Sequence, residues 1–374
     1  HLVPMVMLRR FQEFGHRPVT LAGGATGMIG DPRDVGERSM LSDEDIAANM
    51  EAIKSQLRRF VKFDTGADND GIMVNNADWT MNMNVIDFLR DVGKNFSLNT
   101  MLDRDTVKRR LESDGISYTE FSYMLLQAND FVQLRRNYDC ILQIGGGDQW
   151  GNITAGVEFI RRCDQSRVHA VATPLITKAD GSKFGKTETG TIWLDPELTS
   201  PYAFHQFFLN AEDAMVGDYL KVFTMRTREE IEELARATEV EPHKRQAQRV
   251  LANDVTDLVH GTAERVAAVQ AAAALFGRDD LTTLTQSTLA GAMQEVGAVD
   301  LSGDVTFTDA FVAAGLVDSR SAARRTVKEG GAYLNNQKVT DPDVTLGPDQ
   351  RLAGGYVVLR RGRRNVGGVR LGME

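Results

Sequence analysis

The sequence predicts an α/β fold with a parallel sheet, continued by a helical region and a smaller, β-rich end. Apolar residues at helical spacing over residues 2–15 lead into a short apolar strand at 18–22 and a glycine-rich turn. A second apolar strand, at 140–144, also ends in glycines. Residues 212–276 are rich in Ala, Glu and Arg and lack glycine clusters. Helix, strand and glycine turn in this order are typical of α/β units, which bind ligands at the carboxyl ends of their strands.

Length and composition indicate a protein of several domains. A chain of 374 residues is longer than one hydrophobic core usually serves, so we expect two or three domains. No apolar run reaches the roughly 18 residues of a membrane span, and no signal peptide is recognisable. The two cysteines, Cys140 and Cys163, have no metal-like spacing and suit a reducing compartment. We therefore expect a cytoplasmic protein that holds no metal of its own and does not bind membranes.

Charge is unevenly distributed along the chain. The net charge is −9, yet residues 301–374 hold 11 Lys and Arg against 8 Asp and Glu, which gives that end about +3. A positive end on an acidic protein is typical of a nucleic-acid contact, although a merely solvated tail has the same composition. Both interpretations stay open at this point.

The elements of the first half follow from periodicity. The helix over 2–15 ends at Gly15, a normal helix stop, and is followed by the strand at 18–22. An amphipathic helix is predicted at Asp43–Phe60 and a second strand at 71–75. Residues 85–92 and 96–98 predict a further helix, whose apolar face packs on the core or on a second subunit.

The first glycine turn permits two interpretations. Gly24-Ala-Thr-Gly-Met-Ile-Gly30 resembles the phosphate-binding turn of some nicotinamide-dependent dehydrogenases. That chemistry requires a Tyr-x-x-x-Lys pair, and none of the seven tyrosines is followed by lysine at the fourth position. A charged segment at 33–38 also follows the turn, where a dinucleotide fold needs a tightly packed helix. The dehydrogenase interpretation is therefore disfavoured.

A helix predicted at 119–131 places three polar side chains in line. Tyr123, Gln127 and Asp130 are spaced at i, i+4 and i+7, so they lie along one stripe of that helix. A phenol, an amide and a carboxylate so arranged suit the ammonium group and hydroxyl of one small polar ligand. The alternative is a core tyrosine with the other two side chains in solvent.

The strand at 140–144 runs into a motif that suits a nucleoside. Its sequence is Gly145-Gly-Gly-Asp-Gln-Trp-Gly-Asn152. Glycines let a flat ring approach the backbone, and Asp148 just beyond them is able to accept hydrogen bonds from ribose hydroxyls.

A polar loop at 177–187 places Lys183 and Lys186 three residues apart beside glycines. Flexible lysines and accessible backbone N–H groups suit a polyphosphate. Asp180-Gly181 is also a common turn dipeptide, so the loop by itself is equally typical of an ordinary solvated turn.

Together these motifs resemble one family, the bacterial-type tyrosyl-tRNA synthetases, which are class I aminoacyl-tRNA synthetases. The resemblance rests on the turn at 23–32, on Phe121-Ser-Tyr-Met-Leu-Leu-Gln127, on the motif at 145–154 and on Lys183-Phe-Gly-Lys-Thr187, which resembles the class I Lys-Met-Ser-Lys-Ser loop. It covers essentially the whole chain. His1 resembles the last histidine of the class I His-x-Gly-His signature, so we expect the family's first strand to precede residue 1.

The resemblance implies a fold and its domains. We expect a Rossmann-like catalytic domain at 1–199 that includes the lysine loop, and an α-helical domain at 200–285 that contacts the anticodon arm. A linker at 286–303 and an S4-like α+β RNA-binding domain at 304–374 complete the chain.

Residue roles also follow from the resemblance. Asp31, Tyr123 and Gln127 are expected to hold the ammonium group of tyrosine, while Asp130 accepts a hydrogen bond from its phenol. The expected ATP-binding residues are His1, Gly146, Asp148, Gln149, Lys183 and Lys186, with Gln149 also near the tyrosine carboxylate. The expected catalytic residues are His1, Lys183, Lys186, Thr187 and Arg38. The expected tRNA contacts are Arg320, Arg324, Arg325 and Lys328.

The implied function is ATP-dependent attachment of tyrosine to tRNA through a tyrosyl-adenylate, with release of AMP and pyrophosphate. The resemblance further implies Mg²⁺ brought by ATP and a homodimer. Two alternatives remain: a non-catalytic RNA-binding relative of the synthetases, and the disfavoured dehydrogenase.

Overall fold

The computed structural model describes residues 2–30, 42–113, 115–187 and 190–372. The chain forms two compact units, His1–Phe184 and Gly185–Glu374. The division falls between residues 184 and 185, within the lysine loop. Among the described residues, no helix is long and apolar enough to cross a membrane.

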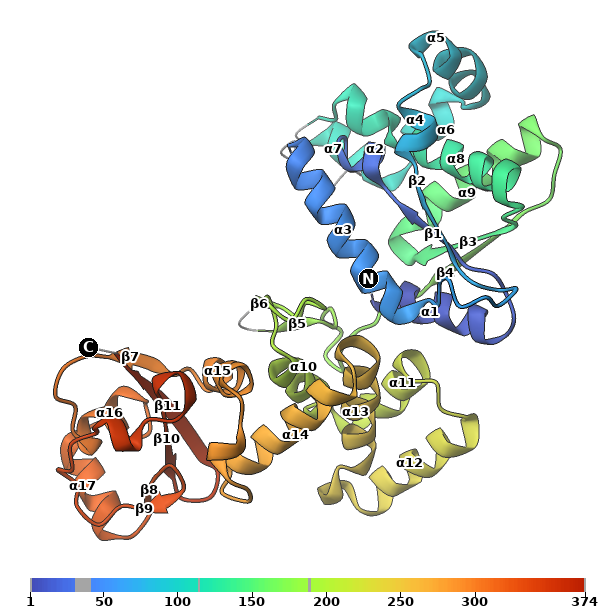
Figure 1. Ribbon diagram of the computed structural model, residues 1–374. Coiled ribbons are helices and arrows are strands. Elements are labelled where there is room, and N and C mark those ends of the chain that lie inside the picture. The colour runs from blue at the N-terminus through green and yellow to red at the C-terminus, as the bar shows by residue number, and fades with distance from the viewer. Residues whose placement is uncertain (1, 31–41, 114, 188–189, 373–374) are drawn as a thin grey trace. The chain divides into compact units, whose positions relative to one another are not determined.

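The first unit contains two pairs of parallel strands (Figure 1). β1 (Val19–Ala22) pairs with β2 (Ile72–Asn75), and β3 (Leu142–Gly146) pairs with β4 (His169–Thr173). The register sets Ala22 opposite Asn75 at the carboxyl ends of the first pair. The predicted parallel pairing is therefore confirmed for β1 and β2, while β3 pairs in parallel with β4, a strand that was not predicted.

The start of β3 differs from the prediction by two residues. Asp139 takes a left-handed conformation (φ 53°), and the N–H of Cys140 donates to the carbonyl of Leu134 at 3.3 Å. Both residues thus complete the end of the preceding helix and are not free to join the strand. The strand includes Gly145 and Gly146, so the glycines predicted to follow it lie partly within it.

The helices of this unit agree with the predicted pattern. α1 (Leu2–Glu13) is followed by Gly15 at φ 88°, and α3 (Asp43–Phe60) begins where the side chain of Ser42 accepts from the N–H of Asp45. The predicted helix at 85–92 is α5 (Val85–Asp87) continued by a π-helical turn at Phe88–Val92. The remaining helical segments are α2 (Gly24–Gly27), α4 (Ala77–Thr80), Gly93–Asn95, α6 (Leu98–Leu102), α7 (Asp105–Glu112), α8 (Tyr118–Tyr138), Gly147–Gln149 and α9 (Trp150–Cys163).

Close packing of α8 on α9 forms the core of the first unit (Figure 1). A side chain at Gly156 of α9 would lie 3.0 Å from the ring of Phe131, so a glycine is needed where the helices approach. Phe131 and Ile160 are fully buried between them. This packing holds α8 rigidly, and α8 is the helix that bears the predicted polar stripe.

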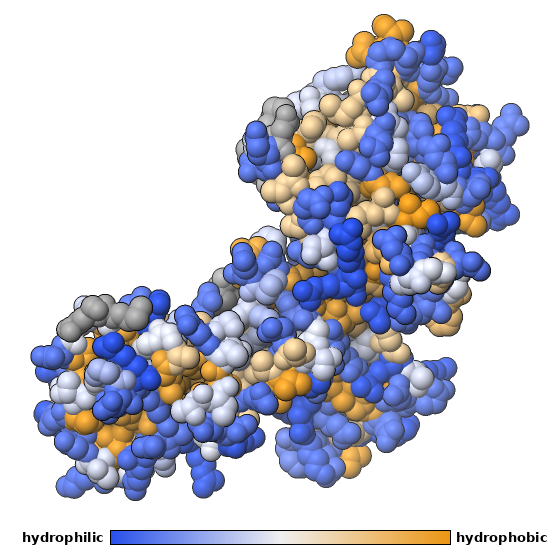
Figure 2. Space-filling view, in the orientation of Figure 1, coloured by the Kyte–Doolittle hydropathy of each residue, from blue (hydrophilic) through white to orange (hydrophobic). Residues whose placement is uncertain are grey.

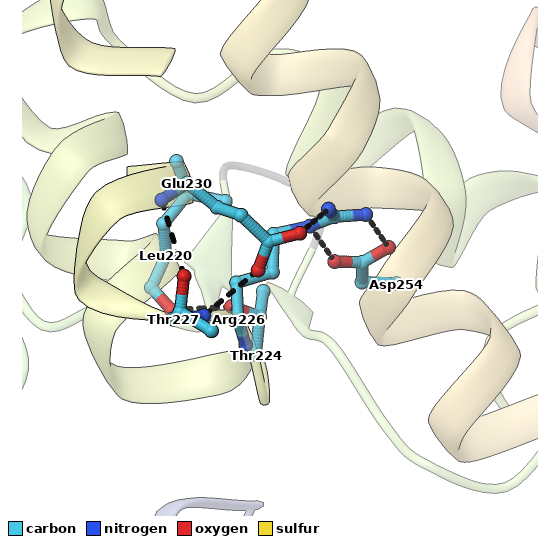
Figure 3. Close-up of polar contacts among 6 residues, drawn as sticks. All are labelled: Leu220, Thr224, Arg226, Thr227, Glu230 and Asp254. Atoms are coloured by element: carbon cyan, nitrogen blue, oxygen red, sulfur yellow. Dashed lines mark hydrogen bonds and ion pairs between the residues drawn. The ribbon is translucent and has the colours of Figure 1, made fainter. Parts of the chain in front are cut away.

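The second unit opens with the hairpin of β5 (Lys186–Thr187) and β6 (Gly190–Thr191) and continues as helices. The predicted helical region is confirmed as α10 (Pro201–Leu209), α11 (Asp213–Phe223), α12 (Arg228–Val240), Pro242–Lys244, α13 (Gln246–His260), α14 (Thr262–Leu275) and the turn Leu281–Thr283. Figure 3 shows how Arg226, between α11 and α12, donates through Nε (2.6 Å) and Nη2 (3.0 Å) to the carboxylate of Asp254 on α13. Arg226 also forms an ion pair with Glu230. The side chain of Glu230 accepts from the N–H of Thr227 and completes a capping box.

The chain ends in a five-stranded sheet in the order β7-β11-β10-β8-β9, in which β7 is Val299–Leu301. Its other elements are α16 (Phe307–Ala313), α17 (Arg320–Lys328), β8 (Ala332–Leu334), β9 (Gln337–Lys338), the turns Pro348–Gln350 and Ala353–Gly355, β10 (Tyr356–Arg361) and β11 (Asn365–Leu371). α16 lies beside β11 (Figure 1), and its Phe307 and Phe311 are fully buried in one cluster with residues of β10 and β11. The predicted pair of short helices followed by a β-rich end is confirmed.

Residues 286–303 are not the linker that their Thr, Ser, Gly and Ala content predicted. They form α15 (Gln286–Glu295) and β7 (Val299–Leu301). α15 buries Leu289 and Met293 in a cluster with Leu275 of α14 and Val358 of β10, and β7 pairs with β11. The small residues have a packing role, since a side chain at Gly291 would lie 2.7 Å from Ser200.

Candidate functional site

The strongest candidate for a ligand-recognising group is a buried carboxylate, Asp130, at the centre of α8. Its side chain is only 2% exposed. Asn76 Nδ2 donates to Asp130 Oδ2 at 3.0 Å, and Trp79 Nε1 donates to Oδ1 at 2.8 Å. Asn76 Nδ2 also donates to Thr26 Oγ1 at 2.9 Å. We call these four side chains, Thr26, Asn76, Trp79 and Asp130, the Asp130 cluster.

The parallel pairing of β1 and β2 brings this cluster together. Asn75 and Asn76 end β2 beside the glycine turn that follows β1. Asn75 Oδ1 accepts from the N–H of Gly24 at 3.2 Å, and Asn76 Oδ1 accepts from the N–H of Ala25 at 2.9 Å. A side chain at Gly24 would collide with Asn75, so the glycine is needed for this approach. The glycine turn thus fixes the amide that orients Asp130.

Burial makes the carboxyl group of Asp130 a weaker acid than that of an ordinary aspartate. Removal from water raises the pKa of its carboxyl to about 6, against an ordinary value of 3.8, although the hydrogen bonds from Asn76 and Trp79 lower it. Perturbed carboxyl groups of this kind cluster at functional sites. At neutral pH the group is an ionised, buried acceptor.

The predicted polar stripe lies on a continuous helix. α8 covers Tyr123, Gln127 and Asp130 without a break, and both Tyr123 and Gln127 are half-buried. The alternative, a core tyrosine with solvent-facing partners, is therefore wrong for Asp130, which is the most buried of the three. Acceptor, amide and phenol lie within two turns of one rigid helix.

The predicted nucleoside motif forms the turn between β3 and α9. A side chain at Gly146 would lie 2.5 Å from Asp148 Oδ1, so the glycine leaves room for that carboxylate. Asp148 is exposed and Gln149 is half-buried, with Gln149 Nε2 3.5 Å from Asp148 Oδ2. Asn152 Nδ2 donates to Gln149 Oε1 at 3.4 Å, and Arg104 Nη1 donates to Asn152 Oδ1 at 3.0 Å. A carboxylate at the end of a parallel strand is thus presented to solvent on a supported turn.

The lysine loop forms tight turns in its described part. The N–H of Lys178 donates to the carbonyl of Ser182 at 2.9 Å, and Thr177 pairs with Lys183 in an antiparallel bridge. Gly181 and Gly185 take positive φ values, 81° and 85°. Lys183 is exposed, and none of the described contacts joins it to the Asp130 cluster or to the nucleoside turn. Both sequence interpretations of the loop therefore remain compatible with its backbone.

Several predicted site residues lie outside the described structure. These are His1, Asp31 and Arg38, together with the side chains of Lys186 and Thr187, whose backbone forms β5. In the part of the chain that is described, no three His, Cys, Asp or Glu side chains are grouped as a metal site requires.

The predicted tRNA-contacting residues lie on α17 and are all exposed. Arg320 pairs with Asp309, and Arg324 Nη2 donates to Asp343 Oδ1 at 2.8 Å. These carboxylates hold two of the four cations in place. Arg325 and Lys328 extend the same positive surface.

Sequence reasoning missed the partners that orient the predicted groups. Asn76, Trp79 and Thr26 support Asp130, and Arg104 supports the nucleoside turn through Asn152. One signal was present: two asparagines end the strand that was expected to lie parallel to the strand before the glycine turn. Carboxyl ends of parallel strands meet at one edge, so these amides had to lie near the turn.

Family models match both parts of the chain. The model "tRNA synthetases class I (W and Y)" matches residues 1–277, and the model "Tyrosine–tRNA ligase SYY-like C-terminal domain" matches residues 288–366. The tyrosine–tRNA ligase of Corynebacterium jeikeium is 60% identical over 375 aligned positions, covering 100% of this chain and 88% of its own length. The chain belongs to the tyrosine–tRNA ligase family. A further family member, from Corynebacterium diphtheriae, is 62% identical and covers 99% of this chain and 88% of its own length.

Solved structures of the ligase family agree. The C-terminally truncated mitochondrial tyrosyl-tRNA synthetase of Aspergillus nidulans superposes with a TM-score of 0.63 at 31% identity, covering 72% of this chain and 79% of its own. The Coccidioides posadasii counterpart gives 0.62 at 30% identity, with 72% and 78% covered. The resemblance inferred from the four motifs is confirmed, and the dehydrogenase interpretation of the glycine turn is wrong. The N–H groups of the glycine turn donate to the side chains of Asn75 and Asn76, and no long helix follows the turn directly in the described residues.

Proposed function

We propose that this chain activates L-tyrosine with ATP and transfers it to tRNA(Tyr). In the first step a carboxylate oxygen of tyrosine attacks the α-phosphorus of ATP, the bond to the bridging oxygen breaks and pyrophosphate leaves. In the second step a terminal ribose hydroxyl of tRNA attacks the carbonyl of the tyrosyl-adenylate, and AMP leaves. Neither step needs a covalent bond to the protein, so binding geometry and charge supply the catalysis.

One observation carries the choice of tyrosine: the buried acceptor Asp130, fixed on both oxygens by Asn76 and Trp79. A carboxylate has about four acceptor positions, so room remains for a phenolic O–H. An amino acid without that hydroxyl would leave a buried charged acceptor incompletely paired, which is costly. Gln127 and Tyr123, about one and two turns earlier on α8, are placed to receive the ammonium end, with Asp31 as the third partner in this proposal.

The ATP site in this proposal is the turn after β3. Asp148 accepts from the ribose hydroxyls, while Gly146 lets the nucleoside approach the backbone. Gln149 binds between nucleotide and tyrosine carboxylate. Its position beside Asp148 supports this assignment.

Phosphate charge is balanced by cations in this proposal. Lys183, Lys186 and Thr187 bind the departing pyrophosphate, assisted by His1 and Arg38. Mg²⁺ arrives bound to the ATP phosphates and supplies further charge neutralisation there. We assign it no protein ligand.

The C-terminal sheet with α16 and α17 acts as an S4-like RNA-binding domain in this proposal. Exposed Arg320, Arg324, Arg325 and Lys328 contact phosphates, which position the tRNA without reading its sequence. The helices at 201–275 contact the anticodon arm. The pairing of Arg320 and Arg324 with carboxylates leaves Arg325 and Lys328 as the stronger electrostatic contributors.

A homodimer is proposed on the basis of an exposed apolar surface in the first unit. It consists of Met81, Val85, Ile86, Leu89, Leu98 and Leu102, which are 41–69% exposed. Figure 2 shows apolar side chains gathered over α5 at the top of the view. Apolar surface of this kind marks an association site, and a two-fold dimer buries the same surface on both copies.

The two free cysteines, Cys140 and Cys163, support a cytoplasmic location.

Exchange of labelled pyrophosphate into ATP tests the activation step. We expect exchange to require tyrosine and to be negligible with tryptophan or phenylalanine. Exchange driven by tryptophan would overturn the assignment of tyrosine. Absence of exchange with any amino acid, combined with tRNA binding, would favour the non-catalytic RNA-binding relative.

A further inference from the structure

Arg104 lies between α6 and α7 and reaches across to the start of α9. It is the residue that precedes α7, and its backbone is extended. Nη1 donates to Asn152 Oδ1 at 3.0 Å, and Nη2 donates to the carbonyl of Gly151. A side chain at Gly151 would lie 3.2 Å from the guanidinium, so the glycine leaves space for it. Resting on the proposed function, we propose that Arg104 is a positioning residue that sets which end of the Gln149 amide faces the substrates.

The guanidinium group of Arg104 decides which atom of Asn152 faces it. Arginine only donates hydrogen bonds, so the atom of Asn152 that faces Arg104 must be the acceptor Oδ1. Asn152 then has its Nδ2 directed away from Arg104. That Nδ2 lies 3.4 Å from Gln149 Oε1.

The orientation of the Gln149 amide follows in the same way. Because Asn152 offers an N–H, Gln149 turns its Oε1 towards it and its Nε2 towards Asp148, 3.5 Å away. One donor-only residue thus determines the direction of two amide side chains, those of Asn152 and Gln149. A flipped Gln149 would place Oε1 beside the Asp148 carboxylate and beside the anionic substrate groups, where it repels them.

The bonds also rank in strength. The contact from Arg104 to Asn152 is charge-assisted and has the ordinary length of 3.0 Å, whereas the two contacts beyond it, at 3.4 and 3.5 Å, are long and therefore weak. Asn152, which the stronger contact fixes, therefore supports the orientation of Gln149.

The diagnostic variant is Asn152→Asp. A carboxylate at 152 keeps Arg104 fully paired, as an ion pair, but has no N–H to offer Gln149. A merely structural role for Arg104, joining α7 to α9, predicts that this variant keeps its activity. The positioning role predicts a loss of about ten-fold in kcat/KM for ATP in pyrophosphate exchange, similar to that of Arg104→Met, because one oriented hydrogen bond to a charged substrate is lost.

Arg104→Lys provides the rescue. A lysine also only donates, so it keeps Asn152 correctly turned although it forms one contact in place of two. We expect it to recover most of the activity lost in Arg104→Met. The matched control is Arg109→Met on the adjoining α7. Its Nε donates to the carbonyl of Asp105 within that helix, and the variant should retain wild-type exchange.

Exchange rates at varied ATP and tyrosine, with thermal unfolding of each variant, complete the test. If both Asn152→Asp and Arg104→Met keep wild-type activity, the inference is overturned and the proposed function stays intact. The inference also fails if Arg104→Met loses activity only in transfer to tRNA, or if Arg104→Lys is no better than Arg104→Met at equal thermal stability. A wild-type protein without tyrosine-dependent exchange overturns the proposed function and the inference with it.

Discussion

The Asp130 cluster and the basic helix α17 use charge in opposite ways. In the cluster one carboxylate is buried and held by two donors from another part of the chain. On α17 the cations are exposed, and two of them form ion pairs with carboxylates of neighbouring segments. Buried charge acts strongly over a short range and selects one small group, whereas exposed charge is screened by salt and suits a long polyanion.

Lys183 of the lysine loop is exposed as well, and this loop gives the largest expected effect. Replacing Lys186 with alanine should slow tyrosyl-adenylate formation by roughly 100-fold, because a cation on the departing pyrophosphate is lost in the transition state. Tyrosine binding should change little. Single-turnover adenylate formation and equilibrium binding of tyrosine measure the two quantities. Equal losses in both would instead assign the loop to the amino-acid pocket.

The buried class is tested by Asp130→Asn. The amide keeps the shape of the carboxylate but removes the charged acceptor, so kcat/KM for tyrosine should fall by about 1.5–3 kcal/mol, or roughly 10- to 150-fold. The value for phenylalanine should hardly change, which narrows discrimination between the two. Pyrophosphate exchange with each amino acid measures this. An equal loss for both would mean that Asp130 acts only in folding.

The pH dependence sharpens the same comparison. Asp130 has its pKa raised to about 6, so the acceptor loses its charge as pH falls through that value. We expect kcat/KM for tyrosine to be level above pH 6 and to fall about ten-fold per pH unit below it, with Asp130→Asn lacking this step. A profile level down to pH 5 in the wild type would contradict the assignment.

The same shift affects stability, with a definite sign. The unfolded carboxyl has the ordinary pKa of 3.8, so between about pH 4 and 6 the folded state binds the proton more strongly. This group therefore opposes folding by about 3 kcal/mol above pH 6, and the opposition disappears as pH falls towards 4. The unfolding free energy of Asp130→Asn should show less of this dependence.

The smallest effect is expected on α17. Replacing Arg325 and Lys328 together with alanine should weaken tRNA binding modestly and reduce the slope of log K against log salt by about 1.4–1.8, for two lost phosphate contacts. Pyrophosphate exchange without tRNA should be unaffected. Replacing the paired Arg320 should change the slope less, and a larger change there would contradict the distinction between paired and unpaired cations.

The same contrast explains how much could be predicted from sequence. Asp130, Gln127 and Tyr123 lie on one helix, and local periodicity was enough to align them. Asn76 and Trp79 are 54 and 51 residues from Asp130, so only the pairing of strands reveals that they meet. Arg104 is likewise 48 residues from Asn152.

Boundaries were predicted well where local signals dominate and poorly where packing does. α3 has the predicted bounds, since Ser42 caps an amphipathic run. α15 was missed because its small residues, such as Gly291, are typical of flexible segments. Here they allow close approach to Ser200, which composition alone does not reveal.

α15 and β7 also determine where the chain tolerates being cut. A fragment beginning at residue 304 would lose β7 and leave Val369 and Leu371 on an open edge of β11, a template for aggregation. The other fragment would keep α15 but lose Val358 of β10, which lies in one cluster with Leu289 and Met293 of α15. Proteases should therefore spare residues 286–301 in the native protein, and a soluble C-terminal fragment has to begin before residue 286.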